Sequence, residues 1–213
     1  MFYFCIDQGK NIPAYELELM YKMRHKVGAL DWNWSLPNKN LGRDKDQFDR
    51  PDTTYLLVYN SEDVLVACAR LNPTTSPHLM SEIFPHQCDF QGVPQGSDIM
   101  ELSRFMVDQD HLTHFEKVQL YLQICLAITK YSVSIGITQL TWLSHTARYT
   151  KSVVVWRTRP LGTPLFYKDD SQEYIAAIME VNAEAVARLQ RFIRTDWTEP
   201  LRQIPTRKKQ RAA

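Results

Sequence analysis

Residues 100–107 read Met-Glu-Leu-Ser-Arg-Phe-Met-Val, which is the composition of a strand with two charges inside it. A carboxylate and a guanidinium among apolar side chains are costly to cover unless each finds a partner or faces a cleft. Glu101 and Arg104 are therefore the first candidate site residues, and a structural ion pair at the rim of a sheet is the alternative interpretation. Two residues three apart face opposite sides of a regular strand, so a shared role requires a β-bulge near Ser103.

The length and composition predict one globular domain. The chain has 213 residues, of which 44% are hydrophobic and 11% aromatic, so it can fill one core well and could only just be divided into two. No run reaches the roughly eighteen apolar residues of a membrane span, and residues 1–7 lack the basic start and cleavage site of a signal peptide. We expect a cytoplasmic protein with one domain over residues 1–205 and a basic, disordered tail over residues 206–213.

Charge and motif content argue against several classes of protein. The formal net charge of +1 disfavours a protein that coats nucleic acid. The basic run over residues 206–211 is either a frayed terminus or a means of attracting an acidic partner. Four cysteines without CxxC spacing predict reduced, buried thiols, and the pair His111 and His114 lacks an apparent third metal ligand. The seven glycines form neither GxGxxG nor GxxxxGK[ST], so we predict no metal site and no nucleotide cradle of those kinds.

Periodicity predicts an alternation of strands and helices. Besides residues 100–107, strand patterns occupy residues 1–6, 55–59, 64–71, 138–144 and 174–181. Helix patterns follow Pro13, cover residues 118–133 and 146–155, and follow Asn182 as an N-cap. Residues 79–84 form either a short helix or an irregular segment. Hairpins early in the chain and crossovers late predict an α/β fold with a mixed sheet that helices cover.

Three features in the first fifty residues carry further charged or aromatic side chains. Arg24 falls beside the apolar stripe of the first helix, where it either reaches solvent from an edge or directs its fork at a carboxylate. Residues 42–49 place three carboxylates around Phe48, which a solvated acidic turn would also explain; the EF-hand pattern is not met. Trp32 and Trp34 lie in a loop, where exposed tryptophans are costly without a target.

Five separated clusters of residues together resemble the LuxI-type acyl-homoserine lactone synthases. The clusters are Arg24 with Val27, Trp34, Gly42-x-Asp44-x-Asp46-Gln47-Phe48-Asp49, Arg70-Leu71-x-Pro73-Thr74 and Glu101-Leu102-Ser103-Arg104-Phe105. Their order and spacing match over about residues 15–110, and the length of the chain fits as well. The resemblance implies a GNAT-like α/β fold, in which a mixed, mostly antiparallel sheet splays at a central cleft and helices cover both faces.

The same resemblance implies an acyltransferase that makes N-acyl-L-homoserine lactone, a quorum-sensing signal. The substrates would be S-adenosyl-L-methionine and an acyl thioester, 5′-methylthioadenosine would be released, and no further cofactor would be needed. Ordinary GNAT enzymes carry an [RQ]xxGx[GA] loop for coenzyme A, which this sequence lacks, so we expect acyl carrier protein as the donor and keep acyl-coenzyme A as the alternative. Basic surface residues would steer an acidic carrier protein. A monomer is the favoured state.

Residue roles follow from the matched motifs. Glu101 would be the general base. Arg104, the second residue counted as catalytic, would help to hold the charged ends of S-adenosylmethionine. A carboxylate with a pKa of about 4.3 falls roughly 3.5 units short of an α-amino group, so desolvation, nearby cations or a relaying water must help Glu101. The residues expected to bind substrate are Arg24, Trp34, Asp46, Asp49, Arg70, Ser103 and Phe105, although Arg70 is better suited to a salt bridge with the acidic loop. The residues expected to line the acyl pocket are Met100, Leu102, Cys125, Trp142 and Ser144.

The sequence also departs from the family pattern. Gly28 stands where phenylalanine is usual, and Trp32 could supply the missing aromatic wall. Met100 replaces tryptophan, and the bulk of Trp142 or Trp156 either shortens the acyl tunnel or fills the core. Two other functions therefore stay open, namely an N-acyltransferase that forms no lactone and a non-catalytic divergent homologue. Release of methylthioadenosine separates the first of these from a lactone synthase.

Overall fold

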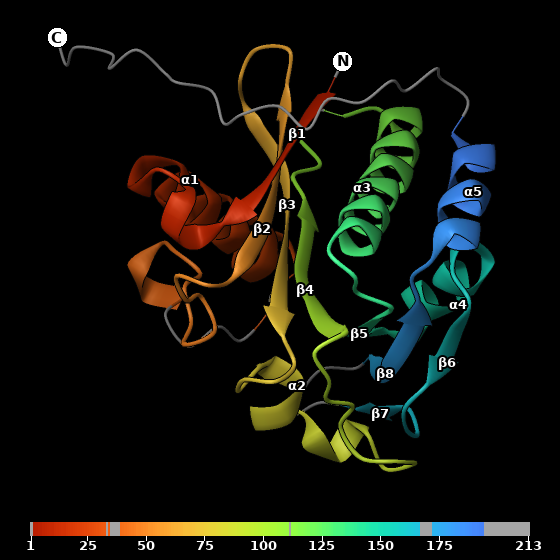
Figure 1. Ribbon diagram of the computed structural model, residues 1–213. Coiled ribbons are helices and arrows are strands. Elements are labelled where there is room, and N and C mark those ends of the chain that lie inside the picture. The colour runs from red at the N-terminus through yellow and green to blue at the C-terminus, as the bar shows by residue number, and fades with distance from the viewer. Residues whose placement is uncertain (1, 33, 35–38, 111, 167–171, 194–213) are drawn as a thin grey trace, which may run out of the picture.

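One twisted sheet runs through the molecule in the computed structural model, which describes residues 2–32, 34, 39–110, 112–166 and 172–193 (Figure 1). The strands are β1 (Phe2–Gln8), β2 (Thr54–Asn60), β3 (Leu65–Pro73), β4 (Ile99–Val107), β5 (Gln139–His145), β6 (Thr158–Pro160), β7 (Leu165–Phe166) and β8 (Glu173–Glu180). Their order in the sheet is β1-β2-β3-β4-β5-β8-β6, and β7 pairs with β8. Every pairing is antiparallel except the one between β4 and β5.

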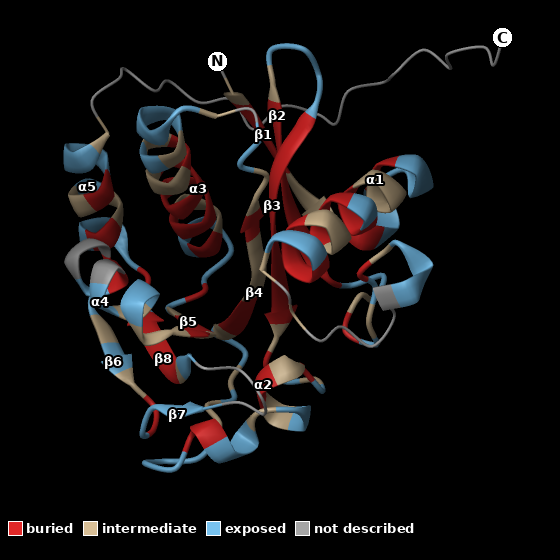
Figure 2. Cartoon of the chain, turned by 180° about the vertical axis from the view of Figure 1, so that it is seen from behind, coloured by how far each residue is buried: buried red, intermediate tan, exposed pale blue. Residues whose placement is uncertain are grey.

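Helices cover both faces of this sheet. They are α1 (Ala14–His25), which runs into the π-helical turn η2 (Lys26–Asp31), α2 (Leu79–Glu82), α3 (His114–Ser134), α4 (Thr146–Val155) and α5 (Ala183–Phe192); three short 3₁₀ turns are η1 (Gly9–Asn11), η3 (Lys39–Leu41) and η4 (Pro85–Gln87). Helix α1 lies on one face of the sheet, α3 lies on the opposite face, and α5 packs beside α3 (Figure 2). The predicted mixed, mostly antiparallel sheet with helices on both faces is confirmed.

The sheet splays between β4 and β5. These strands pair only where residues 99–101 meet residues 139–141. Beyond Glu101, β4 continues in register with β3 alone, and β5 continues in register with β8 alone. The predicted central splay is therefore present, and Glu101 lies at the point where the two strands part.

A β-bulge lies in β4 at the predicted place. The register between β3 and β4 shifts between Cys68 and Arg70, and Arg104 adopts a φ of 51°. Such a left-handed conformation costs a non-glycine residue about 1–3 kcal/mol. The extra residue lets Ser103 and Arg104 both point to the α1 side, whereas Phe105 points to the α3 side.

Most element predictions hold within a residue or two, and the exceptions have local causes. Helix α3 begins four residues before the predicted start at residue 118, because Thr113 and Glu116 form a capping box whose signal the apolar pattern does not contain. The side chain of Asn182 accepts a hydrogen bond from the Ala185 amide, as expected of an N-cap. Residues 79–82 form a helix. The predicted tail over residues 206–213 and His111 lie outside the described residues.

All four cysteines are buried free thiols, as predicted. Burial raises the pKa of Cys68 to about 12 and that of Cys88 to about 11, so neither thiol is a nucleophile at neutral pH. No helix in the described part of the chain is long and apolar enough to cross a membrane.

Candidate active site

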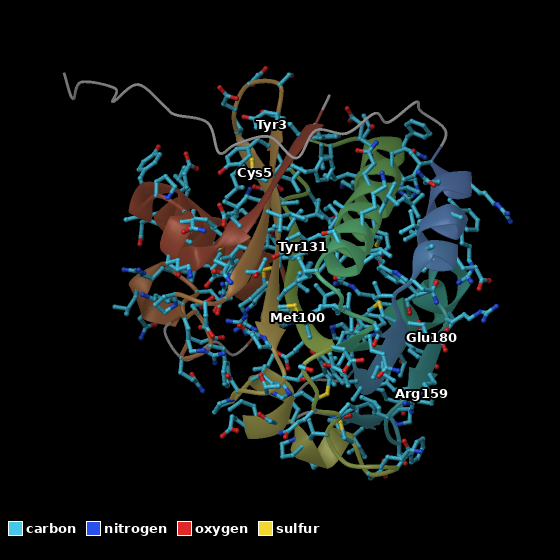
Figure 3. All side chains as sticks on the ribbon, in the orientation of Figure 1. Tyr3, Cys5, Met100, Tyr131, Arg159 and Glu180 are labelled. Atoms are coloured by element: carbon cyan, nitrogen blue, oxygen red, sulfur yellow. The ribbon has the colours of Figure 1, made fainter. Side chains whose placement is uncertain are left out.

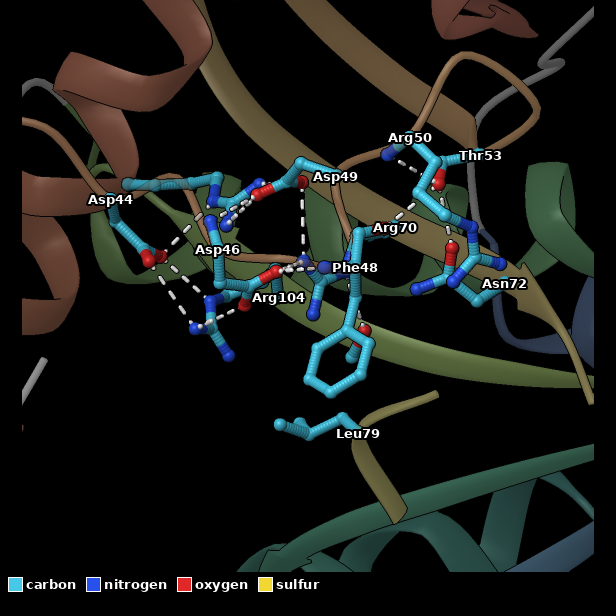
Figure 4. A network of polar contacts seen from close by, with 12 residues as sticks. Asp44, Asp46, Phe48, Asp49, Arg50, Thr53, Arg70, Asn72, Leu79 and Arg104 are labelled. Atoms are coloured by element: carbon cyan, nitrogen blue, oxygen red, sulfur yellow. Dashed lines mark hydrogen bonds and ion pairs between the residues drawn. The ribbon is translucent and has the colours of Figure 1, made fainter. Parts of the chain in front are cut away.

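Three arginines and three aspartates meet on the face of β3 and β4 that lies on the α1 side (Figure 4). Arg24 comes from α1, Arg70 from β3 and Arg104 from the bulge of β4. The three aspartates belong to the loop between η3 and β2, and they are Asp44, Asp46 and Asp49. Each aspartate contacts two of the arginines, and each arginine contacts two of the aspartates. The six side chains therefore close into a ring of alternating charge, which we call the ion ring.

One half of the ion ring is built around Arg24. Its Nε lies 3.1 Å from Asp44 Oδ2, and its Nη1 and Nη2 lie 2.7 and 3.1 Å from the two oxygens of Asp49. Both Arg24 and the Asp49 side chain are 0% exposed. Arg24 is thus neither an edge residue nor a direct contact for solvent, and the alternative prediction, a fork directed at carboxylates, is confirmed.

The other half joins Arg70 and Arg104 through Asp46. Nη1 of Arg70 lies 2.6 Å from Asp46 Oδ1 and 3.1 Å from Asp49 Oδ1. Arg104 places Nε 2.7 Å from Asp44 Oδ2 and Nη2 3.0 Å from Asp46 Oδ2. Arg70 also donates from Nε to Ser103 Oγ at 3.0 Å. The expected salt bridge between Arg70 and the acidic loop is confirmed, and the interpretation of that loop as a solvated turn is wrong.

The ring holds its members in their charged forms. Burial alone would raise the pKa of Asp44, but the Arg104 and Arg24 guanidinium groups lower it to about 2. Burial likewise opposes ionisation of Asp49, and Arg24 and Arg70 still hold its pKa well below the usual range. The same carboxylates raise the pKa of Arg24 against the opposing effect of its burial. Three positive and three negative charges cancel, so the ring orders the site without leaving a net charge.

Each arginine of the ion ring lies over an aromatic side chain, and for Arg104 this side chain is Trp34. Its guanidinium carbon lies 5.9 Å from the centre of the Trp34 ring, and Trp34 packs edge-on against Trp32 at 5.0 Å. Nη1 of Arg104 has no hydrogen-bond partner among the described residues, and the side chain is 9% exposed. Trp32 lies 4.3 Å from the guanidinium of Arg148 on α4. Trp32 therefore lies between the parts of the molecule that carry α1 and α4, and its role as an aromatic wall stays a prediction.

Glu101 lies on the same face as the ring but has different partners. Its Oε1 accepts a hydrogen bond from the Leu79 amide at 3.2 Å and its Oε2 accepts one from the Met80 amide at 2.6 Å, while the residue is 1% exposed. Burial raises the pKa of Glu101, and the Met80 amide, His78 and Arg70 offset only part of this effect. A carboxylate in this state binds a proton more readily than one in water.

Several buried polar atoms around Glu101 have no partner among the residues described. Asn72 and Thr141 flank Glu101 in the sheet, because they pair in register with it from β3 and β5. Asn72 Nδ2, Thr141 Oγ1, His78 Nε2 and Arg70 Nη2 are all buried and unpaired within that part of the chain. Buried polar groups left in this way cost about 1–3 kcal/mol each, so a polar group that paired with them would stabilise this region.

The predicted site residues fall into two groups in space. Arg24, Trp34, Asp46, Asp49, Arg70, Ser103 and Arg104 come together around the ion ring. Phe105 does not join them, because it points to the α3 face and stacks on Tyr121 with ring centres 5.0 Å apart. That these side chains touch substrate stays a prediction, and Arg24 and Asp49 are wholly occupied with one another and with the rest of the ring.

The predicted acyl-pocket residues lie on the other side of the sheet. Met100, Leu102 and Cys125 are buried in the core under α3, and Trp142 packs against this core. Ser144 is buried two residues beyond Trp142 on β5. Their role as an acyl pocket stays a prediction. Trp156 is 1% exposed and donates from Nε1 to Thr129 Oγ1 at 3.0 Å, so it is a core residue.

Two surface hollows are lined by residues outside the ion ring, and Figure 3 labels four of these residues, Met100, Tyr131, Arg159 and Glu180. One of about 310 Å³ is lined by β6, β8 and the end of α4, with Arg159 and Glu180 among its residues. The other, of about 250 Å³, includes Met100 and Tyr131. Neither hollow is lined by Glu101 or Arg104, so neither hollow contains the candidate catalytic residues.

Sequence reasoning missed four residues of this region. Asp44 was quoted in a motif but given no role, although it links Arg24 to Arg104. Asn72, His78 and Thr141 carry no signal of their own along the chain. Asn72 is recognisable only from its place between the motif residues Arg70 and Pro73, and the other two only from the register of the sheet and the position of α2.

The comparisons with known proteins agree on one family. A family model described as autoinducer synthase matches residues 11–189. The isovaleryl-homoserine lactone synthase of Bradyrhizobium diazoefficiens is 33% identical over 151 residues, which make up 70% of this chain and 66% of that protein. The acyl-homoserine-lactone synthase of Acinetobacter baumannii is 41% identical over 85 residues, or 40% of this chain and 45% of that protein. The chain thus spans between about half and two thirds of the curated relatives it matches.

Solved structures extend the likeness over nearly the whole chain. The CoA-dependent acyl-homoserine lactone synthase BjaI, solved with SAM and isopentyl-CoA, superposes with a TM-score of 0.81 at 28% identity, covering 91% of this chain and 90% of that one. The AHL synthase LasI superposes with a TM-score of 0.76 at 20% identity, covering 89% and 94%, which bears on the fold alone. Because the family model matches far more than half of the residues, this chain belongs to the autoinducer synthase family.

Proposed function

We propose that the protein is an acyltransferase that joins the acyl group of a thioester to S-adenosyl-L-methionine and closes N-acyl-L-homoserine lactone. The observation that carries this proposal is the pairing of a buried, proton-binding carboxylate, Glu101, with a charge-neutral ion ring on the same face of the sheet. Two similar proteins that are named acyl-homoserine-lactone synthase support the same reaction.

The first step requires the methionine amine as a free base. Glu101 is the candidate proton acceptor, because burial raises its pKa toward that of the ammonium group. The neutral amine then attacks the thioester carbonyl carbon, the new C–N bond forms, and the thiol leaves with the second amine proton.

Binding of S-adenosylmethionine is assigned to the exposed side of the ring. The free Nη1 of Arg104 suits the methionine carboxylate, since charge-assisted hydrogen bonds from guanidinium are strong. The face of Trp34 suits the sulfonium through cation–π attraction. Asp44 and Asp46, which pair with Arg104, would hold it in place from behind.

The lactone closes in a second step. A carboxylate oxygen of the bound methionine attacks the γ carbon of the same methionine, which is bonded to the sulfonium sulfur. The bond between this carbon and sulfur breaks, and 5′-methylthioadenosine departs with both electrons of that bond. Sulfonium is already a good leaving group, so this step needs orientation more than acid–base help. The contact between Arg104 and the carboxylate would provide that orientation.

The acyl donor is either acyl carrier protein or acyl-coenzyme A. The absence of the GNAT coenzyme A loop favours acyl carrier protein, whereas the similarity to two synthases named as CoA-dependent favours acyl-coenzyme A. Both donors carry a phosphate on the pantetheine arm. Arg148 faces Trp32 and has no carboxylate partner among the described residues, which suits it to that phosphate.

Mass spectrometry of the full chain with S-adenosylmethionine and a panel of acyl carrier protein and acyl-coenzyme A thioesters tests the proposal. We expect one lactone, equal amounts of methylthioadenosine, and loss of both in Glu101→Gln. An acylated amine without methylthioadenosine would identify an N-acyltransferase that forms no lactone. A protein that neither binds nor consumes S-adenosylmethionine would be a non-catalytic homologue.

A further inference from the structure

The indole of Trp142 carries a buried hydrogen-bond donor that the reaction steps above leave unused. Its Nε1 atom is buried and has no acceptor among the residues that the structure describes. An indole N–H can only donate a hydrogen bond, so no other tautomer removes the mismatch. Buried tryptophan N–H groups usually find a partner, and leaving one unpaired is costly. An acceptor on a bound molecule would complete this hydrogen bond.

Trp142 lies at the point where the sheet splays. Thr141, in register with Glu101, is the last residue of β5 that pairs with β4, so Trp142 is the first residue beyond that pairing. Successive side chains of a strand point to opposite faces, and the indole packs against the core on the α3 side. On β8 its partner in register is Ala177, whose methyl group offers no acceptor. The donor therefore stands beside the opening of the splay, on the face away from Glu101.

The core against which Trp142 packs is apolar. It includes Met100 and Leu102 of β4 and Cys125 of α3, while Ser144 follows on the same face of β5. A water molecule needs about two to four polar partners to be held in a buried position, and this lining does not supply them. An apolar pocket with one or two placed polar groups is typical of a site that selects its ligand.

We propose that Trp142 Nε1 donates a hydrogen bond to an oxygen on carbon 3 of the acyl chain, so that the enzyme selects 3-oxoacyl thioesters over unsubstituted ones. This inference rests on the proposed function and names the substrate class of the same site. The attacked thioester carbon must lie with the substrate amine, on the face of Glu101. A chain that enters the splay from that face reaches the α3 side with carbons beyond the carbonyl. The oxygen that meets Trp142 therefore belongs to the chain and not to the thioester.

A 3-oxo group matches this donor better than a 3-hydroxyl group does. A carbonyl oxygen only accepts hydrogen bonds, so a single N–H is enough for it. A hydroxyl brings a donor of its own, which then needs an acceptor in an apolar core. An unsubstituted chain leaves Nε1 of Trp142 unpaired and gains nothing from it. At equal chain length the order of preference is therefore 3-oxo, 3-hydroxy, unsubstituted.

The kinetic test compares kcat/KM for these three thioesters, at the chain length that wild type uses fastest, in wild type and Trp142→Phe. Phenylalanine keeps an aromatic ring and removes the N–H. We expect wild type to prefer the 3-oxoacyl over the unsubstituted thioester by about 10- to 100-fold, and this preference to fall to a few-fold in the variant. Equal losses on all three thioesters would assign the hydrogen bond to the thioester oxygen and overturn the inference. A wild-type enzyme without the preference, or with a preference for the 3-hydroxyacyl thioester, would overturn it as well.

Trp156→Phe is the matched control. Trp156 lies in the same core, but its Nε1 donates to Thr129 Oγ1 at 3.0 Å. This substitution breaks a formed hydrogen bond, so it should lower Tm more than Trp142→Phe does, and it should leave the preference for the 3-oxo chain unchanged. Loss of the preference in Trp156→Phe would show that loosening of the core is the cause. A preference that survives Trp142→Phe but disappears in Ser144→Ala would make the serine the selecting residue. Either result would overturn the inference.

A second measurement needs no turnover. The indole ¹H–¹⁵N signals of the five tryptophans are recorded by NMR, and that of Trp142 is assigned from its loss in Trp142→Phe. The probes are N-(3-oxoacyl)- and N-acyl-homoserine lactones of equal chain length at saturating concentrations. We expect the Trp142 indole proton to move downfield with the 3-oxo lactone only, since a new acceptor deshields it. No movement, or equal movement with both lactones, would overturn the inference.

The two proposals fail in different ways. A wild-type protein that forms no lactone from any thioester would overturn the proposed function and this inference together. A protein that forms lactones and methylthioadenosine, but does so equally well from 3-oxo and unsubstituted chains, would overturn only the role of Trp142.

Discussion

The ion ring and the pocket around Glu101 lie on the same face of β3 and β4, yet they shift the pKa of a carboxyl group in opposite directions. In the ring every carboxylate meets two guanidinium groups, and the pKa of Asp44 is lowered to about 2. Glu101 meets two backbone amides, and its pKa is raised. Fully paired charges fix a geometry, whereas an underpaired carboxylate stays able to accept a proton. Strand β4 supplies Arg104 to the ion ring and Glu101 to the other pocket.

The bulge in β4 is what allows this division. Without it, Arg104 would point to the α3 side, and the ring would lose one of its arginines. The ring in turn supplies Arg104 with contacts to two aspartates, which offset the cost of its left-handed backbone.

Removing the negative charge of Glu101 should have the largest effect on activity. We expect Glu101→Gln to lower kcat for lactone formation by about 10²- to 10⁴-fold, the usual contribution of a general base, while the circular dichroism spectrum stays that of the wild type. Steady-state kinetics measure this loss. Activity within a few-fold of wild type would show that the pocket is not where the proton goes.

Breaking the ion ring should damage the fold. Asp44→Asn leaves Arg24 and Arg104 each short of a buried partner, and loss of one member of a buried pair costs about 3–5 kcal/mol. We expect Tm to fall by about 10 °C in a chain of this size, as read by differential scanning calorimetry.

The matched control for the ring is Asp52→Asn. Asp52 also pairs with an arginine, Arg50, but its side chain is 53% exposed. Exposed pairs contribute about 0–1 kcal/mol, so Tm should barely move. Equal effects of the two substitutions would mean that the ring is no more than a set of surface ion pairs.

Low pH alone should weaken the ion ring and lower the stability of the wild-type protein. The folded-state pKa values of Asp44 and Asp49 lie below their unfolded values, so their contribution to stability is complete above about pH 4. That contribution is lost as the pH falls toward 2, the folded-state pKa of Asp44. Thermal melts from pH 6 down to 2 should show a falling Tm with a shallower slope in Asp44→Asn. Parallel slopes in the two proteins would contradict this assignment.

Glu101 should show the opposite and smaller pH effect on stability. Its folded-state pKa is raised, so ionising it in the fold costs stability as the pH rises through and above about 4.3. The difference in Tm, Glu101→Gln minus wild type, should therefore grow between pH 4 and pH 8. Thermal melts of the two proteins at matched pH measure this difference. A constant difference across that range would mean that burial of Glu101 is not costly.

Much of this fold is readable from local patterns. The hairpin of β2 and β3, the long apolar helix α3 and the cap at Asn182 depend on neighbours a few residues apart, and their predictions hold. The start of α3 was misplaced because its capping box lies outside the apolar stripe. The bulge near Ser103 was predictable because two charges that must share a face stand three residues apart.

The sequence by itself determined the family, the order of the elements and the charged residues from which the site is built. Only the tertiary structure decided that Asp44, Asp46 and Asp49 close a ring with three arginines, that Phe105 turns away from it, and that the first amides of α2 donate to Glu101. The physical reason is one of range. Local periodicity specifies the face on which a side chain lies. Contacts between residues such as Arg24 and Asp49, or Met80 and Glu101, depend on sheet register and on how loops fold across it.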